Sequence, residues 1–194
     1  MGKKIKKCAQ NYIYIAFSIY LVTILLQDTS LYRISGMIEN LVKFFKYACF
    51  FSFCIKILID LMKKNKISIV MICMMVLSII IYFSSGNKKL IILMILLLSL
   101  RDTDENKLLS ISAKTYLITY LIIVIGSLLN LIPDWTYETL NGSERHSLGF
   151  YYPTITVARY LMIVLMYVYL KKDKINVFEI ILFQIINIIL YKCT

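Results

Sequence analysis

The sequence predicts an all-α fold, a polytopic transmembrane helix bundle of about seven spans. Hydrophobic residues make up 60% of the 194 residues. They form long runs with few charges, such as residues 67–83, 116–132 and 155–170. A helix rises about 1.5 Å per residue, so roughly 20 apolar residues cross a hydrocarbon core of about 30 Å. A soluble helix would instead interleave polar residues to make a side that faces water.

The charges point to the same class of protein. The chain has 22 Lys and Arg residues and 11 Asp and Glu residues, which gives a net charge of +11. The basic clusters separate apolar runs, which is typical of the cytoplasmic loops of membrane proteins. No soluble basic domain is present, so we expect no nucleic-acid partner. The five Cys residues include no C-x-x-C pair, so the sequence predicts no zinc site and no disulfide framework. We also expect no other metal and no cofactor.

We expect one transmembrane domain over residues 1–194, with the N-terminus in the cytoplasm and a multi-pass location in the cell membrane. Lysine clusters at residues 3–7, 63–66 and 171–174 all face the cytoplasm in this arrangement. The first span follows a basic segment, as in a signal peptide, but residues 27–31 contain no small-x-small cleavage site. The expected spans are about 11–26, 41–62, 67–83, 90–100, 115–132, 154–170 and 177–191.

Two of these spans are unusual. Residues 90–100 would cover only about 16 Å as a helix, so this segment either crosses with help from snorkelling flanking Lys and Arg side chains or re-enters the membrane. We expect it to cross. The second span carries Lys43 and Lys46 near its outer end, where they either snorkel or form a basic mouth for an anionic lipid headgroup. Lys56 and Asp60 are four residues apart and are expected to pair.

The only long loop, residues 133–153, is predicted to lie outside the cytoplasm. It contains the only Trp and the only His of the chain. Its aromatic residues either form an interfacial belt at headgroup depth or provide a platform on which sugar rings stack. Trp135 and Tyr152 are the candidate substrate-binding residues of such a platform. The full aromatic set of the loop is Trp135, Tyr137, Phe150, Tyr151 and Tyr152.

Three charged or titratable residues in and after this loop are candidates for chemistry. The guanidinium of Arg145 can grip phosphate oxygens with two parallel hydrogen bonds, or anchor the loop to lipid headgroups. His146 can act as a general base near neutral pH, or be merely solvated. Arg159 lies within the sixth span, where a charge is costly without a partner. It either snorkels outward or shares an anion site with Arg145.

Residues 145–154, R-H-S-L-G-F-Y-Y-P-T, resemble the R-x-S-L-G-F-x-H-P-N motif of Wzy-type polysaccharide polymerases. These are the O-antigen ligase/polymerase-like membrane proteins of bacterial capsule and exopolysaccharide clusters. The resemblance covers most of residues 60–194, and this motif is its specific part. Tyr152 stands where the motif has His, and Thr154 stands where it has Asn.

The resemblance implies an enzyme of the outer leaflet that joins repeat units carried on undecaprenyl pyrophosphate. The sugar at one chain's reducing end passes to an acceptor hydroxyl, and the lipid pyrophosphate leaves. Arg145 matches the motif Arg and would stabilise the developing pyrophosphate charge, while a base would activate the acceptor. The expected partners are membrane lipids, the undecaprenyl-pyrophosphate-linked oligosaccharide and other polysaccharide-assembly membrane proteins.

Family members usually have about twice this length and ten or more spans, so the chain resembles the N-terminal half of a polymerase. Two other classes stay open. One is a non-catalytic membrane subunit of a transporter or polysaccharide export system. The other is a small membrane peptidase, which needs a Cys and a His on one side of the membrane. The only candidates there are His146 and Cys193, which lies at a fraying terminus.

Overall fold

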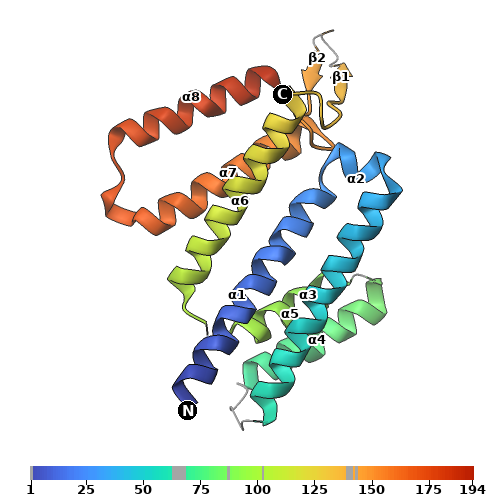
Figure 1. Ribbon diagram of the computed structural model, residues 1–194, viewed down its shortest axis with the longest axis vertical. Helices are drawn as coiled ribbons and strands as arrows, with labels where there is room; N and C mark the ends of the chain where they lie inside the picture. The colour runs from blue at the N-terminus through green and yellow to red at the C-terminus, as the bar shows by residue number, and fades with distance from the viewer. Residues whose placement is uncertain (1, 63–68, 87, 102, 139–141, 143) are drawn as a thin grey trace. The chain divides into compact units, whose positions relative to one another are not determined.

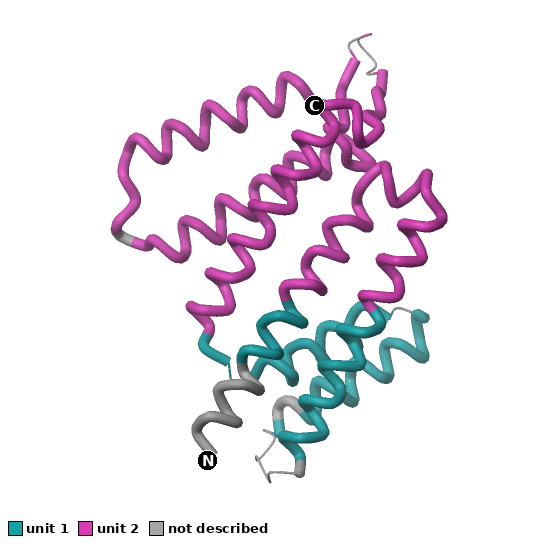
Figure 2. The backbone as a smooth tube through the Cα atoms, in the orientation of Figure 1, with its two compact units in different colours: residues 1–17, 47–104 teal, residues 18–46, 105–194 magenta. Residues whose placement is uncertain are grey.

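The computed structural model describes residues 2–62, 69–86, 88–101, 103–138, 142 and 144–194. The chain forms two compact units (Figure 2): residues 1–17 with 47–104, and residues 18–46 with 105–194. Two long helices, α1 (Gly2–Gln27) and α3 (Gly36–Met62), each contribute to both units. The predicted single domain over residues 1–194 stays a prediction.

The described residues are mostly helical, which confirms the predicted class (Figure 1). Each of the seven expected ranges overlaps a helix, although residues 129–132 of the fifth range lie beyond the end of its helix and residues 67 and 68 lie outside the described part of the chain. A short helix between the first two expected spans and a small β-hairpin were not expected. The remaining elements are α2 (Ser30–Ile34), α4 (Ile69–Ser85), α5 (Lys89–Leu100), α6 (Glu105–Leu128), β1 (Thr136–Glu138), β2 (Glu144–His146), α7 (Pro153–Lys171), η1 (Lys172–Lys174) and α8 (Val177–Cys193).

The number of membrane spans needs correction. Among the described residues, only α6 and α7 are long and apolar enough to cross a membrane by themselves. Shorter apolar helices cover residues 11–27, 72–85 and 89–100. The structure therefore does not support seven full spans. The physical reasons are length, because the 12 residues of α5 rise only about 18 Å, and charge, because α3 carries several Lys and acidic residues along its length.

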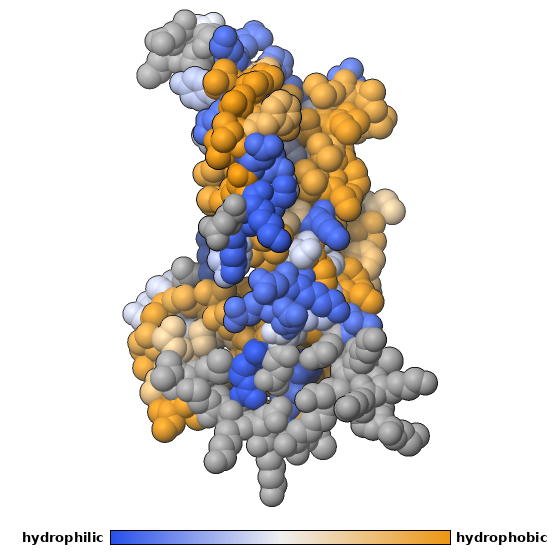
Figure 3. Space-filling view, turned by 90° about the vertical axis from the view of Figure 1, so that its left-hand side faces the viewer, coloured by the Kyte–Doolittle hydropathy of each residue, from blue (hydrophilic) through white to orange (hydrophobic). Residues whose placement is uncertain are grey.

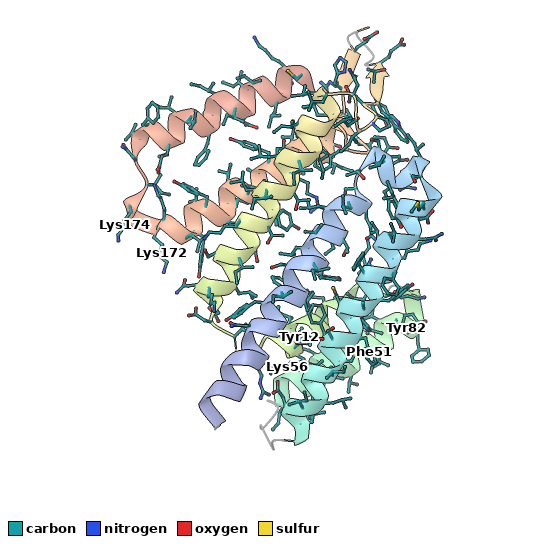
Figure 4. The ribbon with its side chains drawn as sticks, viewed as in Figure 1. Tyr12, Phe51, Lys56, Tyr82, Lys172 and Lys174 are labelled. Atoms are coloured by element: carbon teal, nitrogen blue, oxygen red, sulfur yellow. The ribbon has the colours of Figure 1, made fainter. Side chains whose placement is uncertain are left out.

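In the unit formed by residues 1–17 and 47–104, α4 packs against α5 as a helical hairpin. Gly86, at φ +67°, makes the turn after α4, a backbone conformation that glycine adopts without steric cost. Polar contacts also tie the unit: the Tyr12 hydroxyl donates to Ser52 Oγ at 2.7 Å. The predicted pairing of Lys56 with Asp60 is confirmed, and both side chains are mostly buried (Lys56 is labelled in Figure 4).

In the unit formed by residues 18–46 and 105–194, α6 packs along α7. Tyr120 of α6 places its ring against Phe150 and Tyr160, with centroids 5.6 and 6.5 Å apart. Helix α7 begins at Pro153, whose fixed φ suits the first turn of a helix. Helix α8 begins with a capping box of Asn176 and Glu179. This packing fixes the base of the loop that carries the motif.

Candidate functional site

The loop between α6 and α7 folds as a two-stranded antiparallel hairpin. In its register Tyr137 faces Arg145 and Thr136 faces His146. Directly opposed residues of an antiparallel pair share a face of the sheet, and successive residues alternate between faces. Arg145 and Tyr137 therefore lie on one face of the hairpin, and His146 lies on the other.

Asp134 organises the second face. One carboxylate oxygen accepts a hydrogen bond from the Leu148 backbone N–H at 2.7 Å and one from Ser147 Oγ at 3.1 Å. The other lies 2.7 Å from Nδ1 of His146. Because a carboxylate only accepts, Nδ1 of His146 carries the proton, and Nε2 is left as a potential proton acceptor. This arrangement fixes the ring of His146 against the loop.

The S-L-G-F part of the motif is a tight turn packed into the unit. Leu148 and Gly149 both adopt positive φ, +49° and +83°. A Cβ on Gly149 would lie 3.1 Å from the Ile123 carbonyl oxygen and 3.0 Å from Ser127 Cβ, so only glycine fits against α6. Phe150 is completely buried. In this structure the four residues Ser147–Phe150 position the loop.

The corner between α1 and α2 holds the same turn from the other side. Thr29 forms an isolated β-bridge with Phe150. The Ser30 backbone N–H donates to the Gly149 carbonyl at 3.0 Å, and the Tyr151 N–H donates to the Asp28 carbonyl at 2.7 Å. The buried Ser30 hydroxyl also bonds the carbonyl of Pro133. The loop is thus clamped between α6, α7 and the α1–α2 corner.

Arg159 has a partner within this clamp. Its guanidinium donates through Nε to a carboxylate oxygen of Asp28 at 2.9 Å, and its Nη2 also contacts that oxygen. Both side chains are about three-quarters buried. This ion pair explains how a charge is tolerated within an apolar helix. The role of Arg159 in an anion site shared with Arg145 stays a prediction.

We expect Asp28→Asn to destabilise the protein by about 1–3 kcal/mol, because it leaves the Arg159 charge buried without its carboxylate. The double variant Asp28→Asn with Arg159→Gln should recover part of that loss, since it removes both charges. Thermal unfolding of Asp28→Asn, Arg159→Gln and the double variant gives a double-mutant cycle, which measures the interaction between the two side chains. Strictly additive losses would show that the two side chains do not interact.

Aromatic rings and a second arginine gather on the Arg145 side of the hairpin. Tyr151 packs edge to face against Trp135 and Tyr152, with centroids 5.3 and 4.2 Å apart. Tyr137 packs against Tyr152 at 5.2 Å. The exposed guanidinium of Arg33, from α2, lies 4.3 Å from the centre of the Tyr151 ring. We call this cluster the aromatic ledge; it consists of Trp135, Tyr137, Tyr151, Tyr152 and the guanidinium of Arg33.

The ledge is linked by hydrogen bonds. The Tyr137 hydroxyl donates to the Tyr151 carbonyl at 2.7 Å. A hydrogen bond with the Tyr151 side chain raises the pKa of the Tyr152 phenol, so Tyr152 stays protonated at neutral pH. Tyr152 is 42% exposed. The other three rings, those of Trp135, Tyr137 and Tyr151, are half-buried, so Tyr152 is the ring of the ledge that is most open to a ligand.

The structure brings together some predicted site residues and separates others. Trp135 and Tyr152 both contact Tyr151 in the ledge. Arg145 is exposed, and its guanidinium lies 6.0 Å from the centre of the Tyr191 ring of α8. His146 faces Asp134 instead. The role of His146 as a general base stays a prediction.

Sequence reasoning did not single out Asp134, Asp28 or Arg33. Asp134 directly follows Pro133, and an Asp at the entry of a loop often binds backbone N–H groups further on, so that signal was available. Asp28 and Arg33 had no such local signal. They lie more than 100 residues before their partners in the loop, and only tertiary structure connects them.

Comparisons with protein-family models, with curated proteins and with solved structures find no match to this chain. The arrangement of the loop and its clamp is therefore the basis for any functional assignment.

Proposed function

We propose that this chain is a multi-pass membrane protein that acts on lipid-pyrophosphate-linked saccharides. In this proposal it transfers repeat units of a bacterial surface polysaccharide to an acceptor glycan at the outer leaflet, as the Wzy-like motif at residues 145–154 implies. The observation that carries the proposal is the pairing of Arg145 with Tyr137 on one face of a clamped hairpin, the face that carries the aromatic ledge.

The proposed chemistry divides between these groups. A guanidinium can stabilise the charge that develops on a leaving pyrophosphate, and Arg145 is exposed for that contact. The rings of Trp135 and Tyr152 offer apolar faces to the pyranose rings of the repeat unit. The Tyr152 hydroxyl, in the position of the motif His, does not serve as a base at neutral pH.

His146 has a separate place in the proposal. It lies on the opposite face of the strand from Arg145, so the two side chains do not converge on one bond. Its contact with Asp134 supports a positioning role, in which it fixes the carboxylate that binds Ser147 and Leu148. Activation of the acceptor hydroxyl by its free Nε2 is the alternative role, and both are tested below.

The membrane placement rests on exposed apolar surface as well as on helix length. In α8, residues such as Phe178, Ile181 and Ile188 are each more than half exposed. Helix α4 carries a similar set, and Figure 3 shows broad apolar areas on the face that it draws. Exposed apolar patches of this extent would aggregate in water but match a lipid environment. A multi-pass placement is part of the proposal, with α6 and α7 as the helices long and apolar enough to cross by themselves.

The test is a transfer assay with the full chain. The protein is reconstituted in liposomes, together with other membrane proteins of polysaccharide assembly, and supplied with an undecaprenyl-pyrophosphate-linked repeat unit. The proposal expects polymers longer than one repeat only when the chain is present. A reporter fused after Glu138 should score outside the cytoplasm. Absence of elongation with a correctly placed loop would remove the enzymatic assignment.

A second candidate, a non-catalytic membrane subunit of a transporter or polysaccharide export system, is favoured by one observation. Ser147, Gly149 and Phe150 of the motif are buried, and their contacts account for these residues as packing groups alone. In that case the chain would copurify with a polysaccharide-assembly membrane protein, and variants of the loop that fold would leave polymer length unchanged.

A further inference from the structure

Helix α2 holds Arg33 against the aromatic ledge. The helix begins at Ser30, which is bound to the loop because its backbone N–H donates to the Gly149 carbonyl at 3.0 Å. Three residues later, the Arg33 guanidinium lies 4.3 Å from the centre of the Tyr151 ring, a favourable contact between a cation and an aromatic ring. Because α2 and this ring belong to the same clamp, the guanidinium is positioned before a ligand binds.

The charge of Arg33 is not neutralised by a carboxylate among the described residues. Arg33 is exposed, and none of the ion pairs in that part of the chain involves it. The two carboxylates that hold the loop have other partners, since Asp28 binds Arg159 and Asp134 binds His146. An exposed guanidinium without a carboxylate partner keeps its N–H donors for an anionic group from outside the chain.

Arg33 also lies beside the ring of the ledge that is most open to a ligand. Tyr152 is exposed, and its ring centre is 4.2 Å from that of Tyr151, the ring that Arg33 contacts. A hydrogen bond with Tyr151 raises the pKa of the Tyr152 phenol, and the nearby charge of Arg33 opposes that shift. A sugar that stacks on Tyr152 would therefore have its edge next to the guanidinium.

We propose that Arg33 is a specificity residue of the transfer reaction, and that it selects acidic repeat units. In this inference, which rests on the proposed function, the guanidinium binds an anionic substituent, a carboxylate or a phosphate, on a sugar that stacks on Tyr152. The planar fork of a guanidinium matches two oxygens of either group. A neutral sugar in the same place forms only weaker hydrogen bonds, so the acidic sugar binds more tightly.

Arg145 keeps its separate role in this arrangement. It lies on β2, and its guanidinium is 6.0 Å from the centre of the Tyr191 ring of α8. Arg33 is on α2 and contacts the ring of Tyr151 instead. The two arginines therefore belong to different elements and lie beside different rings. One can bind the leaving pyrophosphate while the other binds the sugar.

The experiment measures saccharide binding to the full chain purified in detergent. Fluorescence of Trp135, the only Trp and a member of the ledge, is followed during titration with methyl glucuronide or methyl glucoside, and with the corresponding galacturonide and galactoside. We expect the acidic member of at least one pair to bind about tenfold more tightly, the effect of one hydrogen bond to a charged group. Glucose 6-phosphate is a further acidic probe. Tighter binding of this probe than of both uronides identifies phosphate as the substituent, and the reverse order identifies a carboxylate.

Substitutions assign the preference to Arg33. Arg33→Gln should abolish it and leave the affinity for the neutral glycosides unchanged, and Arg33→Lys should keep only part of it. Lys174→Gln removes an exposed charge from η1 (labelled in Figure 4) and is the matched control, which should bind like the wild type. Equal affinities for acidic and neutral probes, or a preference that survives Arg33→Gln, would overturn the inference.

This result is separate from that of the liposome assay, because no lipid, acceptor or elongation enters the binding measurement. Elongation without a preference for acidic probes removes the role of Arg33 and leaves the proposed function. A preference that depends on Arg33, without elongation, removes the transfer reaction and leaves Arg33 as a saccharide-binding residue.

Discussion

Gly149→Ala is expected to destabilise the clamped loop by about 2–5 kcal/mol. Two costs add. The residue has φ +83°, where an L side chain is strained by roughly 1–2 kcal/mol. Its Cβ would also lie 3.1 Å from a backbone oxygen of α6, and backbone cannot rotate away as a side chain can, which adds about 1–3 kcal/mol. Fluorescence of Trp135, the only Trp, reports the unfolding of this loop directly.

Two other glycines distinguish the cost of positive φ from the cost of the contact with α6. Gly142 also has positive φ, +74°, but nothing lies within 4 Å of its Cβ position, so Gly142→Ala should cost only about 1–2 kcal/mol. Gly36 has neither feature, and Gly36→Ala should be close to neutral. The midpoint of thermal unfolding should fall by roughly 4–20 °C for Gly149→Ala. Equal shifts for Gly149→Ala and Gly142→Ala would contradict the packing of the turn against α6.

Arg145→Ala should abolish elongation in the liposome assay, with a loss of at least about 100-fold in rate. Removing one donor that stabilises developing charge costs roughly 10²–10³ in other enzymes. Arg145→Lys should recover only part of the rate, because an ammonium binds as a point charge and lacks the planar fork. Stability should hardly change, since Arg145 is exposed. Polymer of wild-type length from Arg145→Ala would refute the proposed contact with pyrophosphate.

His146→Gln is the companion variant, and it distinguishes the two roles of this residue. The Gln amide can still donate a hydrogen bond to Asp134, but it cannot accept a proton as a base. Loss of elongation with unchanged Trp135 fluorescence would therefore establish a base. Retained elongation would leave His146 as a residue that positions the loop. Lys174→Gln serves as the control for loss of a positive charge elsewhere.

The helices could be predicted from the sequence because apolar runs, and the charged or turn-forming residues that separate them, are local signals. The ends of α5 and α7 lie within about one residue of expectation. Helix α6 begins at Glu105, ten residues earlier than expected, because residues 105–114, a mixture of charged, polar and apolar side chains, continue the helix beyond the apolar run that defined the predicted span. Composition could not show which helices cross a membrane, since α3 combines an apolar surface with charges along its length.

The candidate site could be predicted only in part. The loop, its aromatic residues and Arg145 follow from the sequence, because they stand together in one segment between two prolines. The placement of Arg145 and His146 on opposite faces depends on the strand register. That register cannot be predicted from the sequence of a three-residue strand. The partner of Arg159 is Asp28, 131 residues away. No local pattern indicates a contact of that separation.

The clamp between the α1–α2 corner and the loop can form only late in translation, because the corner is synthesised well before the loop. Ser30 bonds the carbonyls of Pro133 and Gly149, residues 103 and 119 positions later in the chain. At the usual pace of translation, roughly 5–20 s pass between the synthesis of the corner and the arrival of its first partner. The polar groups of the corner are unsatisfied by the loop during that interval. Pulse-labelled nascent chains should therefore be protease-sensitive near residue 30 until Gly149 has emerged from the ribosome, and resistant afterwards.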